Sequence, residues 1–145
     1  MKRLLLTLAA ILTLGSLASA EEWLTDYAKA LAQAKTQNRP VLIDFTGSDW
    51  CGWCMKLDKE VFSLEDFKSY AAQKLVLLKI DFPRRKELPA AEAAQNQKLA
   101  NQFHIQGFPT VIVLKPDGTK AGELGYTPGG PKAFIAELEK VTPKK

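Results

Sequence analysis

Short apolar runs alternate with helix-like segments along most of this chain, and that alternation limits the folds open to it. Strands are expected over residues 41–45, 75–80 and 110–114, and residues 119–124 are expected to return as the second arm of a hairpin. Helices are expected over residues 23–37, 51–60, 63–70, 90–103 and 131–141. Strands that alternate with helices pair in parallel through crossover helices, whereas the late hairpin adds antiparallel strands. The order predicts a single α/β domain with a mixed central sheet of about four strands flanked by helices.

The composition agrees with one globular domain. The chain has 145 residues, 46% of them hydrophobic and 25% charged, so intrinsic disorder is not expected. Its two cysteines are too few for a scaffold knotted by several disulfides or for a His/Cys zinc finger. A formal net charge of +4 is too small to indicate a nucleic-acid partner.

The first twenty residues have the layout of a secretory signal peptide. Lys2 and Arg3 precede an apolar stretch over residues 4–14, and Ala18-Ser19-Ala20 provides the small residues that signal peptidase reads. Cleavage near Ala20 would leave residues 21–145 as an exported domain, periplasmic or secreted. The alternative is an uncleaved membrane anchor, although the apolar stretch is shorter than the ~20 residues that a membrane-spanning helix needs.

Cys51 and Cys54 lie where a buried strand gives way to a helix. Residues three apart share one face of a helix, so these side chains can form a disulfide without large strain. Cys51 falls at the helix N-terminus, where free N–H groups and the helix dipole favour a thiolate. Cys54 lies one turn deeper and is expected to be more shielded. The pair therefore suits an attacking thiol followed by a resolving thiol.

Three other interpretations of these cysteines remain open. A purely structural disulfide would close a very short loop and stabilise the fold by only about 2 kcal/mol. A metal site would need further ligands, and only His104 and nearby carboxylates are available. A pair of inert core cysteines would not need the strand–turn–helix context. The pattern favours a redox-active pair, with no metal and no cofactor beyond the Cys51–Cys54 disulfide itself.

Three motifs together resemble the thioredoxin superfamily, and in particular its exported bacterial thioredoxin-like members. They are Asp44-Phe45, Trp50-Cys51-Gly52-Trp53-Cys54 and Gly107-Phe108-Pro109-Thr110. The resemblance covers nearly all of residues 23–141 and implies a thioredoxin-like fold. It also implies a mechanism in which the Cys51 thiolate attacks a substrate disulfide, and Cys54 then resolves the mixed disulfide.

The resemblance further implies roles for residues around the pair. Pro109 matches the family's cis-proline, which lies beside the active disulfide and holds the substrate chain; the alternative is an ordinary proline at a strand entry. Asp44 matches the buried aspartate that accepts a proton from the resolving cysteine; the alternative is a strand-end aspartate paired with a lysine. Asp44 and Cys51 are one residue further apart than in thioredoxin itself. The aromatic Phe108 also departs from the small or aliphatic residue of many relatives.

The remaining candidate site residues are assigned to substrate binding. Trp50 and Trp53 are expected to frame an apolar rim for peptide contact, although Trp50 would serve equally well as a packing residue under the loop. The basic run Arg84-Arg85-Lys86 is interpreted as a solvated loop, with a docking patch as the alternative. The substrate-binding set is Trp50, Gly52, Trp53, Phe108, Pro109 and Thr110.

The residues between the cysteines bear on the direction of electron flow. No histidine lies between Cys51 and Cys54 to stabilise the Cys51 thiolate further, which argues against a strong oxidant. We therefore expect an exported monomer that reduces protein disulfides, with a membrane electron donor as a candidate partner. The alternatives are an oxidase or isomerase of the same fold, a non-catalytic peptide-binding module, and a copper-handling protein, which the lack of a Met-rich or His-rich tract disfavours.

Overall fold

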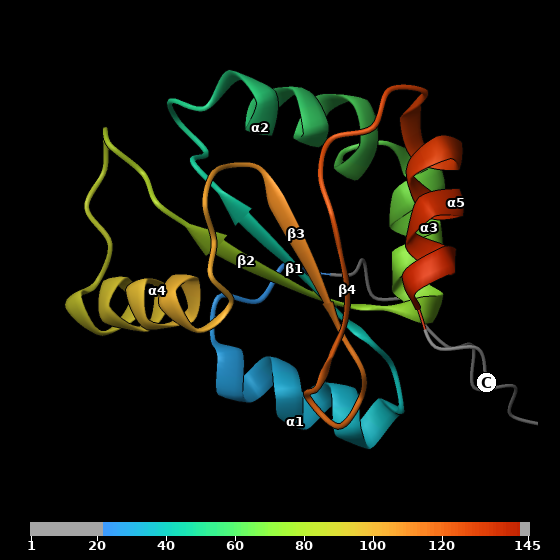
Figure 1. The fold of residues 1–145 in the computed structure, drawn as a ribbon, viewed down its shortest axis with the longest axis horizontal. Coiled ribbons are helices and arrows are strands. Elements are labelled where there is room, and N and C mark those ends of the chain that lie inside the picture. Colours follow the sequence, from blue (N-terminus) through green and yellow to red (C-terminus); the bar gives the residue numbers. More distant parts are fainter. Residues whose placement is uncertain (1–21, 143–145) are drawn as a thin grey trace, which may run out of the picture.

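The computed structural model describes residues 22–142, so the predicted signal peptide and its cleavage site lie outside the described residues. Ten elements follow one another along the chain (Figure 1). They are α1 (Tyr27–Gln37), β1 (Val41–Thr46), α2 (Gly52–Leu57), the π-helical turn η1 (Asp58–Phe62), α3 (Glu65–Lys74), β2 (Val76–Asp81), α4 (Ala90–Gln102), β3 (Thr110–Leu114), β4 (Lys120–Leu124) and α5 (Gly130–Val141).

The four strands form one mixed sheet in the order β2-β1-β3-β4. β1 pairs in parallel with β2, through the long crossover that contains α2 and α3. β3 pairs antiparallel with β1 and with β4. The predicted fold class, a single α/β domain around a mixed sheet, is confirmed.

Helices cover both faces of the sheet, and each face has its own hydrophobic core. Because side chains alternate along a strand, neighbouring residues of β1 contribute to opposite cores. Leu42 joins the core beneath η1, α3 and α5, which includes Phe67 and Phe134. Ile43 and Phe45 join the core on the other face, beneath α1 and α4. All six residues of β1 are buried, which explains its nearly continuous apolar sequence.

The first helix begins later than the spacing of apolar residues predicts. α1 starts at Tyr27, because the Asp26 side chain accepts the Lys29 N–H at 2.9 Å and caps the helix there. Leu24 instead bridges to the outer edge of β2, where its N–H donates to the Leu77 carbonyl at 2.9 Å. The prediction that this helix begins at residue 23 was wrong, because an unpaired sheet edge binds this part of the backbone.

The second and third helices also differ in detail from the prediction. α2 passes directly into η1, so the helical segment ends at Phe62 rather than near residue 60. Ser63 does not cap α3: Leu64 occupies the N-cap position, and the Ser63 hydroxyl donates to Asp58 at 3.0 Å. No helix within residues 22–142 is long and apolar enough to cross a membrane.

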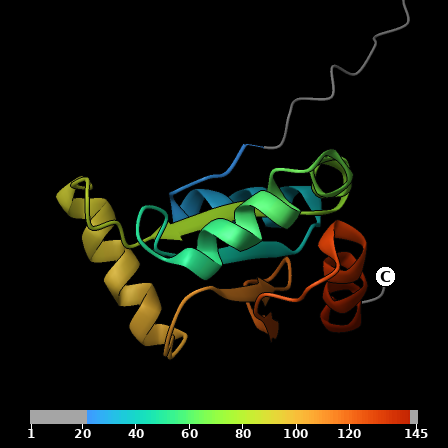
Figure 2. The same cartoon turned by 90° about the horizontal axis from the view of Figure 1, so that it is seen from above.

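The topology brings three loops to one end of the sheet. β1 and β2 are parallel, so both end there, and β3 begins there because it is antiparallel to β1. Figure 2, seen from above, shows α2 in front of the strands. The loops after β1, after β2 and before β3 therefore meet around the start of α2.

Candidate active site

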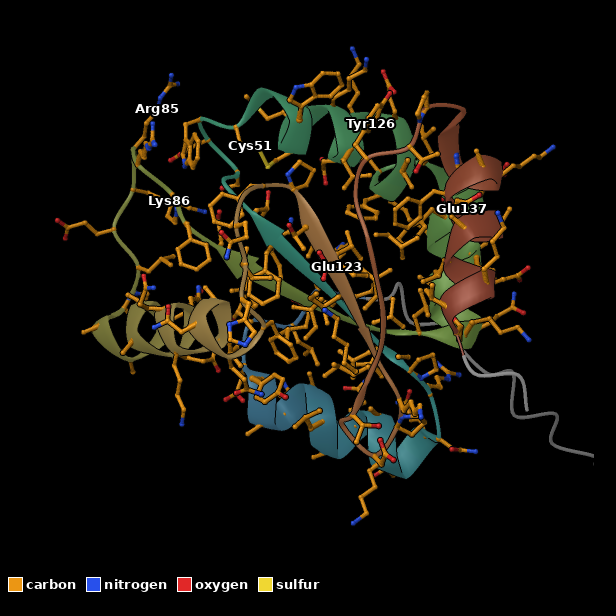
Figure 3. The ribbon with its side chains drawn as sticks, viewed as in Figure 1. Cys51, Arg85, Lys86, Glu123, Tyr126 and Glu137 are labelled. Atoms are coloured by element: carbon orange, nitrogen blue, oxygen red, sulfur yellow. A yellow bond between two sulfur atoms is a disulfide. The ribbon has the colours of Figure 1, made fainter. Side chains whose placement is uncertain are left out.

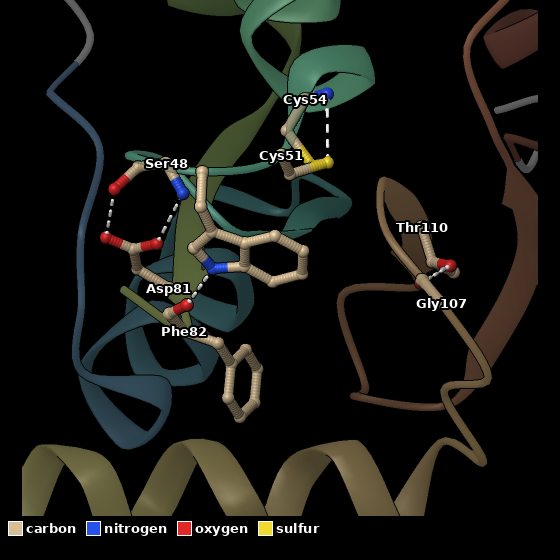
Figure 4. The surroundings of a disulfide bond; sticks show 8 residues. Ser48, Cys51, Cys54, Asp81, Phe82, Gly107 and Thr110 are labelled. Atoms are coloured by element: carbon tan, nitrogen blue, oxygen red, sulfur yellow. Dashed lines mark hydrogen bonds between the residues drawn. A yellow bond between two sulfur atoms is a disulfide. The ribbon is translucent and has the colours of Figure 1, made fainter. Parts of the chain in front are cut away.

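Cys51 and Cys54 form a disulfide at the start of α2 (Figure 4). Cys51 is the N-cap residue, and its sulfur accepts the Cys54 N–H at 3.2 Å. The relative exposure of Cys51 is 7% and that of Cys54 is 4%, so Cys51 is the more exposed of the two. This N-terminal position places Cys51 where unpaired N–H groups and the helix dipole favour a negative sulfur.

Trp50 lies half-buried beside the disulfide and is fixed by specific contacts. Its indole N–H donates to the Phe82 carbonyl at 2.7 Å (Figure 4). A Cβ at Gly47 would lie only 2.5 Å from the indole carbon Cε2, so this position requires glycine for close approach. Trp50 also meets Phe108 edge-on, with ring centroids 6.0 Å apart. The side chain packs under the loop and also contributes to the aromatic rim.

Two aspartates join the loop before α2 to the loop after β2. Asp81 accepts the Ser48 N–H at 2.9 Å and the Ser48 hydroxyl at 2.6 Å. Asp49 accepts the backbone N–H groups of Arg84 at 2.9 Å and Arg85 at 2.8 Å. The Arg84 N–H, followed by that of Arg85, lowers the pKa of the Asp49 carboxyl below its ordinary value. These contacts hold the loop between β1 and α2 in place.

Replacing Asp81 with alanine is expected to lower the free energy of unfolding by about 2 kcal/mol, because the Ser48 N–H and hydroxyl would lose their shared acceptor. Urea unfolding at pH 7 measures this change. The milder Ser48→Ala variant removes only the hydroxyl contact and should cost about 1 kcal/mol. Wild-type stability in the Asp81→Ala protein would contradict the conclusion that the hydrogen bonds of Asp81 to Ser48 stabilise this loop.

The loop before β3 forms the opposite wall of the site. The peptide bond between Phe108 and Pro109 is cis. Phe108 stacks on Phe82 with ring centroids 5.1 Å apart. Thr110 is the first residue of β3, and its hydroxyl donates to the Gly107 carbonyl at 2.7 Å (Figure 4). On the other wall, Gly52 is exposed, with open space where a Cβ would be. The structure thus brings the predicted substrate-binding residues to the end of the sheet that carries the disulfide.

Asp44 is buried in β1 and has an unusual carboxyl group. Its relative exposure is 5%, and its Oδ1 atom is buried without a hydrogen-bond partner. Burial raises the pKa of this carboxyl from 3.8 to about 7, and the positive charge of Lys79 on the neighbouring strand opposes that rise. Lys79 forms no ion pair with Asp44 within residues 22–142, and its Nζ lies over the Trp23 ring at 5.3 Å. Proton transfer from Cys54 to Asp44 stays a prediction.

Trp53 is the most exposed large apolar residue of the described chain, with a relative exposure of 58%. Its ring lies 5.3 Å from that of Tyr126, which follows β4 (Figure 3). Lys56 Nζ lies 5.0 Å from the Trp53 ring and 5.1 Å from the Tyr126 ring. The Tyr126 hydroxyl donates to Glu60, and this hydrogen bond raises the pKa of the Tyr126 phenol. Trp53 is therefore held at the surface by neighbours from α2 and from the loop after β4.

Several of these neighbours were not predicted as site residues. Asp81 ends a buried strand beside Thr46, and an acid directly after the apolar run of residues 75–80 was the signal in the sequence, although its contacts depend on the strand register. Tyr126 has no local signal, because it reaches Trp53 only through the folded arrangement of β4 and α2. Within residues 22–142, no three His, Cys, Asp or Glu side chains are grouped so as to hold a metal ion.

Comparison with known proteins assigns the chain to a family. The family model for a thioredoxin-like domain matches residues 27–142. The disulfide bond reductase DsbH of Chlamydia pneumoniae is 33% identical over 113 residues, covering 78% of this chain and 68% of that protein. The thioredoxin-related protein DsbJ of the same organism is 31% identical over 151 residues; the match covers 94% of this chain but only 43% of DsbJ.

A solved structure supports the same assignment. The structure of a DsbH oxidoreductase superposes with a TM-score of 0.79 at 29% sequence identity, covering 93% of this chain and 94% of that one. The similarity thus extends over the sheet, the helices and the segment that carries the two cysteines. Family match, relatives and fold agree, and the chain belongs to the thioredoxin-like domain family, within the thioredoxin superfamily of thiol-disulfide oxidoreductases.

Proposed function

We propose that this protein is an exported reductase of protein disulfides. The observation that carries the proposal is the Cys51–Cys54 disulfide at the N-terminus of α2, with no histidine between the two cysteines. A protonated histidine between the cysteines would stabilise the Cys51 thiolate further. Without it, this thiolate is less stabilised than in strongly oxidising members of the superfamily. The similarity to a relative named as a disulfide bond reductase supports the same direction.

The proposed reaction transfers two electrons from this protein to a client, while the proton of Cys54 passes to Asp44 and then to solvent, and the client thiolates take their protons from solvent. The Cys51 thiolate attacks one sulfur of the client disulfide, forming a mixed disulfide and releasing the other client sulfur as a thiolate. Asp44 then accepts the proton of the Cys54 thiol, and the resulting thiolate attacks Cys51. The client leaves with both sulfurs reduced, and the protein is left with its Cys51–Cys54 disulfide.

The cycle requires a donor dithiol to reduce the Cys51–Cys54 disulfide again. We propose that a membrane redox partner supplies these electrons, because the predicted leader over residues 1–20 would place the domain outside the cytoplasm. Cleavage near Ala20 would release residues 21–145 as a monomer. Trp50, Gly52, Trp53, Phe108, Pro109 and Thr110 are proposed to contact the client chain.

The equilibrium reduction potential of the Cys51–Cys54 pair tests the proposed direction. Residues 21–145 would be equilibrated in graded thiol/disulfide buffers, and the reduced fraction would be counted by alkylation of free thiols. We expect a potential near that of thioredoxin, about −270 mV, rather than the value of about −120 mV typical of a dedicated oxidase. A potential near the oxidase value would overturn the reductase proposal while leaving disulfide exchange intact.

A further inference from the structure

A cationic side chain lies over the ring of each of the two tryptophans near Cys51. The Arg84 guanidinium carbon lies 3.7 Å from the centroid of Trp50, and Lys56 Nζ lies 5.0 Å from that of Trp53. Figure 3 shows Arg85, Cys51 and Tyr126 along the same end of the molecule. A cation thus lies on the aromatic rim on each side of the sulfur that would attack a client, and the Arg84 cation has no ion-pair partner within residues 22–142.

The carboxylates around these cations also have other partners, and Glu60 forms an ion pair with Lys56 itself. Asp49 accepts two backbone N–H groups, and Asp81 binds Ser48 and the Lys86 ammonium at 3.3 Å. Glu60 accepts the Tyr126 hydroxyl and lies 4.0 Å from Lys56 Nζ. The exposed side chains of Arg84 and Arg85 form no ion pair within residues 22–142, and Glu87 is the one acid in their loop.

The loop that carries the arginines is anchored to the site. Its backbone is fixed by Asp49, and the carbonyl of Phe82 accepts the Trp50 indole N–H. The Phe82 ring stacks on Phe108, which lies next to Pro109. The Arg84 charge therefore has a defined position on the Trp50 ring, which a freely solvated loop would not give. The interpretation of residues 84–86 as only a solvated loop does not account for these contacts.

We propose that this surface selects disulfides that lie in acidic segments of client proteins, with Arg84 as the principal cation and Lys56 as the second. The proposal rests on the proposed function, because it names the substrate class of the same site. A guanidinium binds a carboxylate through two parallel hydrogen bonds, and an exposed positive rim also accelerates the encounter with an acidic partner. A client carboxylate near its cysteine would meet Arg84 as the sulfur approaches Cys51.

The test compares two synthetic peptides, each with one intramolecular disulfide. One has glutamates beside its cysteines, and the other has glutamines at the same positions. Rates of reduction by residues 21–145 in the dithiol form are measured at low salt, and the acidic-to-neutral rate ratio is compared among proteins. Using the ratio within each protein removes the intrinsic reactivity of each peptide.

Arg84→Gln is expected to lower this ratio about threefold, and Arg84→Glu to lower it about tenfold, because rim charges act mainly on association rates. Lys35→Ala removes an exposed cation of α1, at the opposite end of the sheet, and should leave the ratio unchanged. In the wild type, the ratio should fall toward that of Arg84→Glu near 1 M salt, where the screening length is about 3 Å.

The possible outcomes separate the two proposals. If both peptides are reduced but the ratio does not respond to Arg84 or to salt, acidic selection is overturned while the reductase function stands. If Lys35→Ala lowers the ratio as much as Arg84→Gln, the effect belongs to net charge and the proposed surface is likewise overturned. If neither peptide is reduced by the dithiol protein, the proposed function fails and the inference fails with it.

Discussion

Replacing Cys54 with alanine is expected to reduce turnover of a disulfide-containing protein by about a thousandfold and to trap covalent complexes with clients. Cys51 would still attack, but no neighbouring thiolate would remain to release the client from the mixed disulfide. The two sulfurs are bonded in the structure, so no other group is needed to explain resolution by Cys54. Non-reducing gels of cells expressing the variant, followed by reduction of the excised complexes, measure the trapping.

The matched control for this experiment is Cys51→Ala. This variant keeps one cysteine in the motif but loses the sulfur at the N-cap of α2, so it should neither turn over nor trap clients. Trapping that is equal in the two variants would contradict the assignment of Cys51 as the attacking sulfur. If neither variant forms mixed disulfides and the wild type shows no turnover, the fold acts as a non-catalytic peptide-binding module.

Replacing Asp44 with asparagine is expected to remove a large pH dependence from the stability of the disulfide form. Burial raises the pKa of this carboxyl from 3.8 to about 7 in the folded protein, while the unfolded chain restores its ordinary value. A difference of this size corresponds to on the order of 4 kcal/mol. Urea unfolding of wild type and Asp44→Asn at pH 4 and pH 8 measures the change in the stability difference.

The direction of this effect follows from proton binding. Between about pH 4 and pH 7 the unfolded state has lost the Asp44 proton that the folded state retains, so wild-type stability falls as the pH rises. Above pH 7 both states are ionised and the cost stays constant. Asp44→Asn should therefore gain stability relative to wild type toward pH 8, whatever its absolute stability at pH 4.

Asp117→Asn provides a control in which the pH dependence of stability has the opposite sign. The hydroxyl and N–H of Thr119 lower the pKa of the exposed Asp117 carboxyl, so its contribution is present above the usual carboxyl pKa and is lost as the pH falls. If Asp44→Asn and wild type keep the same pH dependence, the buried carboxyl does not titrate with a raised pKa. That result would also remove the basis for Asp44 as a proton acceptor near neutral pH.

The order of helices and strands was predictable because the spacing of apolar residues within each segment indicates its type. The buried run at residues 41–45 and the 3.6-residue spacing near Phe134 and Leu138 each identify their element without reference to the rest of the chain. The start of α1 was not predictable in this way. Trp23 and Leu24 fit a helical spacing, but Leu24 pairs with β2, whose edge lies far away in the sequence.

The candidate site shows the same division between local and long-range information. Cys51 and Cys54 were identified because a disulfide between residues three apart needs only a helical turn. Pro109 and Asp44 were identified through family resemblance rather than from spacing. Tyr126 and Asp81 were missed, since each acquires its neighbours only from the packing of β4 and the register of β2.

The positions of these residues in the sequence bear on the order in which the site forms during folding. The two cysteines lie in one short stretch, so a newly made chain can oxidise them before any sheet exists. The wall that faces them requires β3 to pair with β1, which is a slower step because it closes a long loop of chain. In a chain that has not yet paired these strands, the two thiols lie close together in sequence but Phe108 and Pro109 are not yet beside them. We therefore expect the wall formed by Phe108 and Pro109 to be completed last, when β3 pairs with β1.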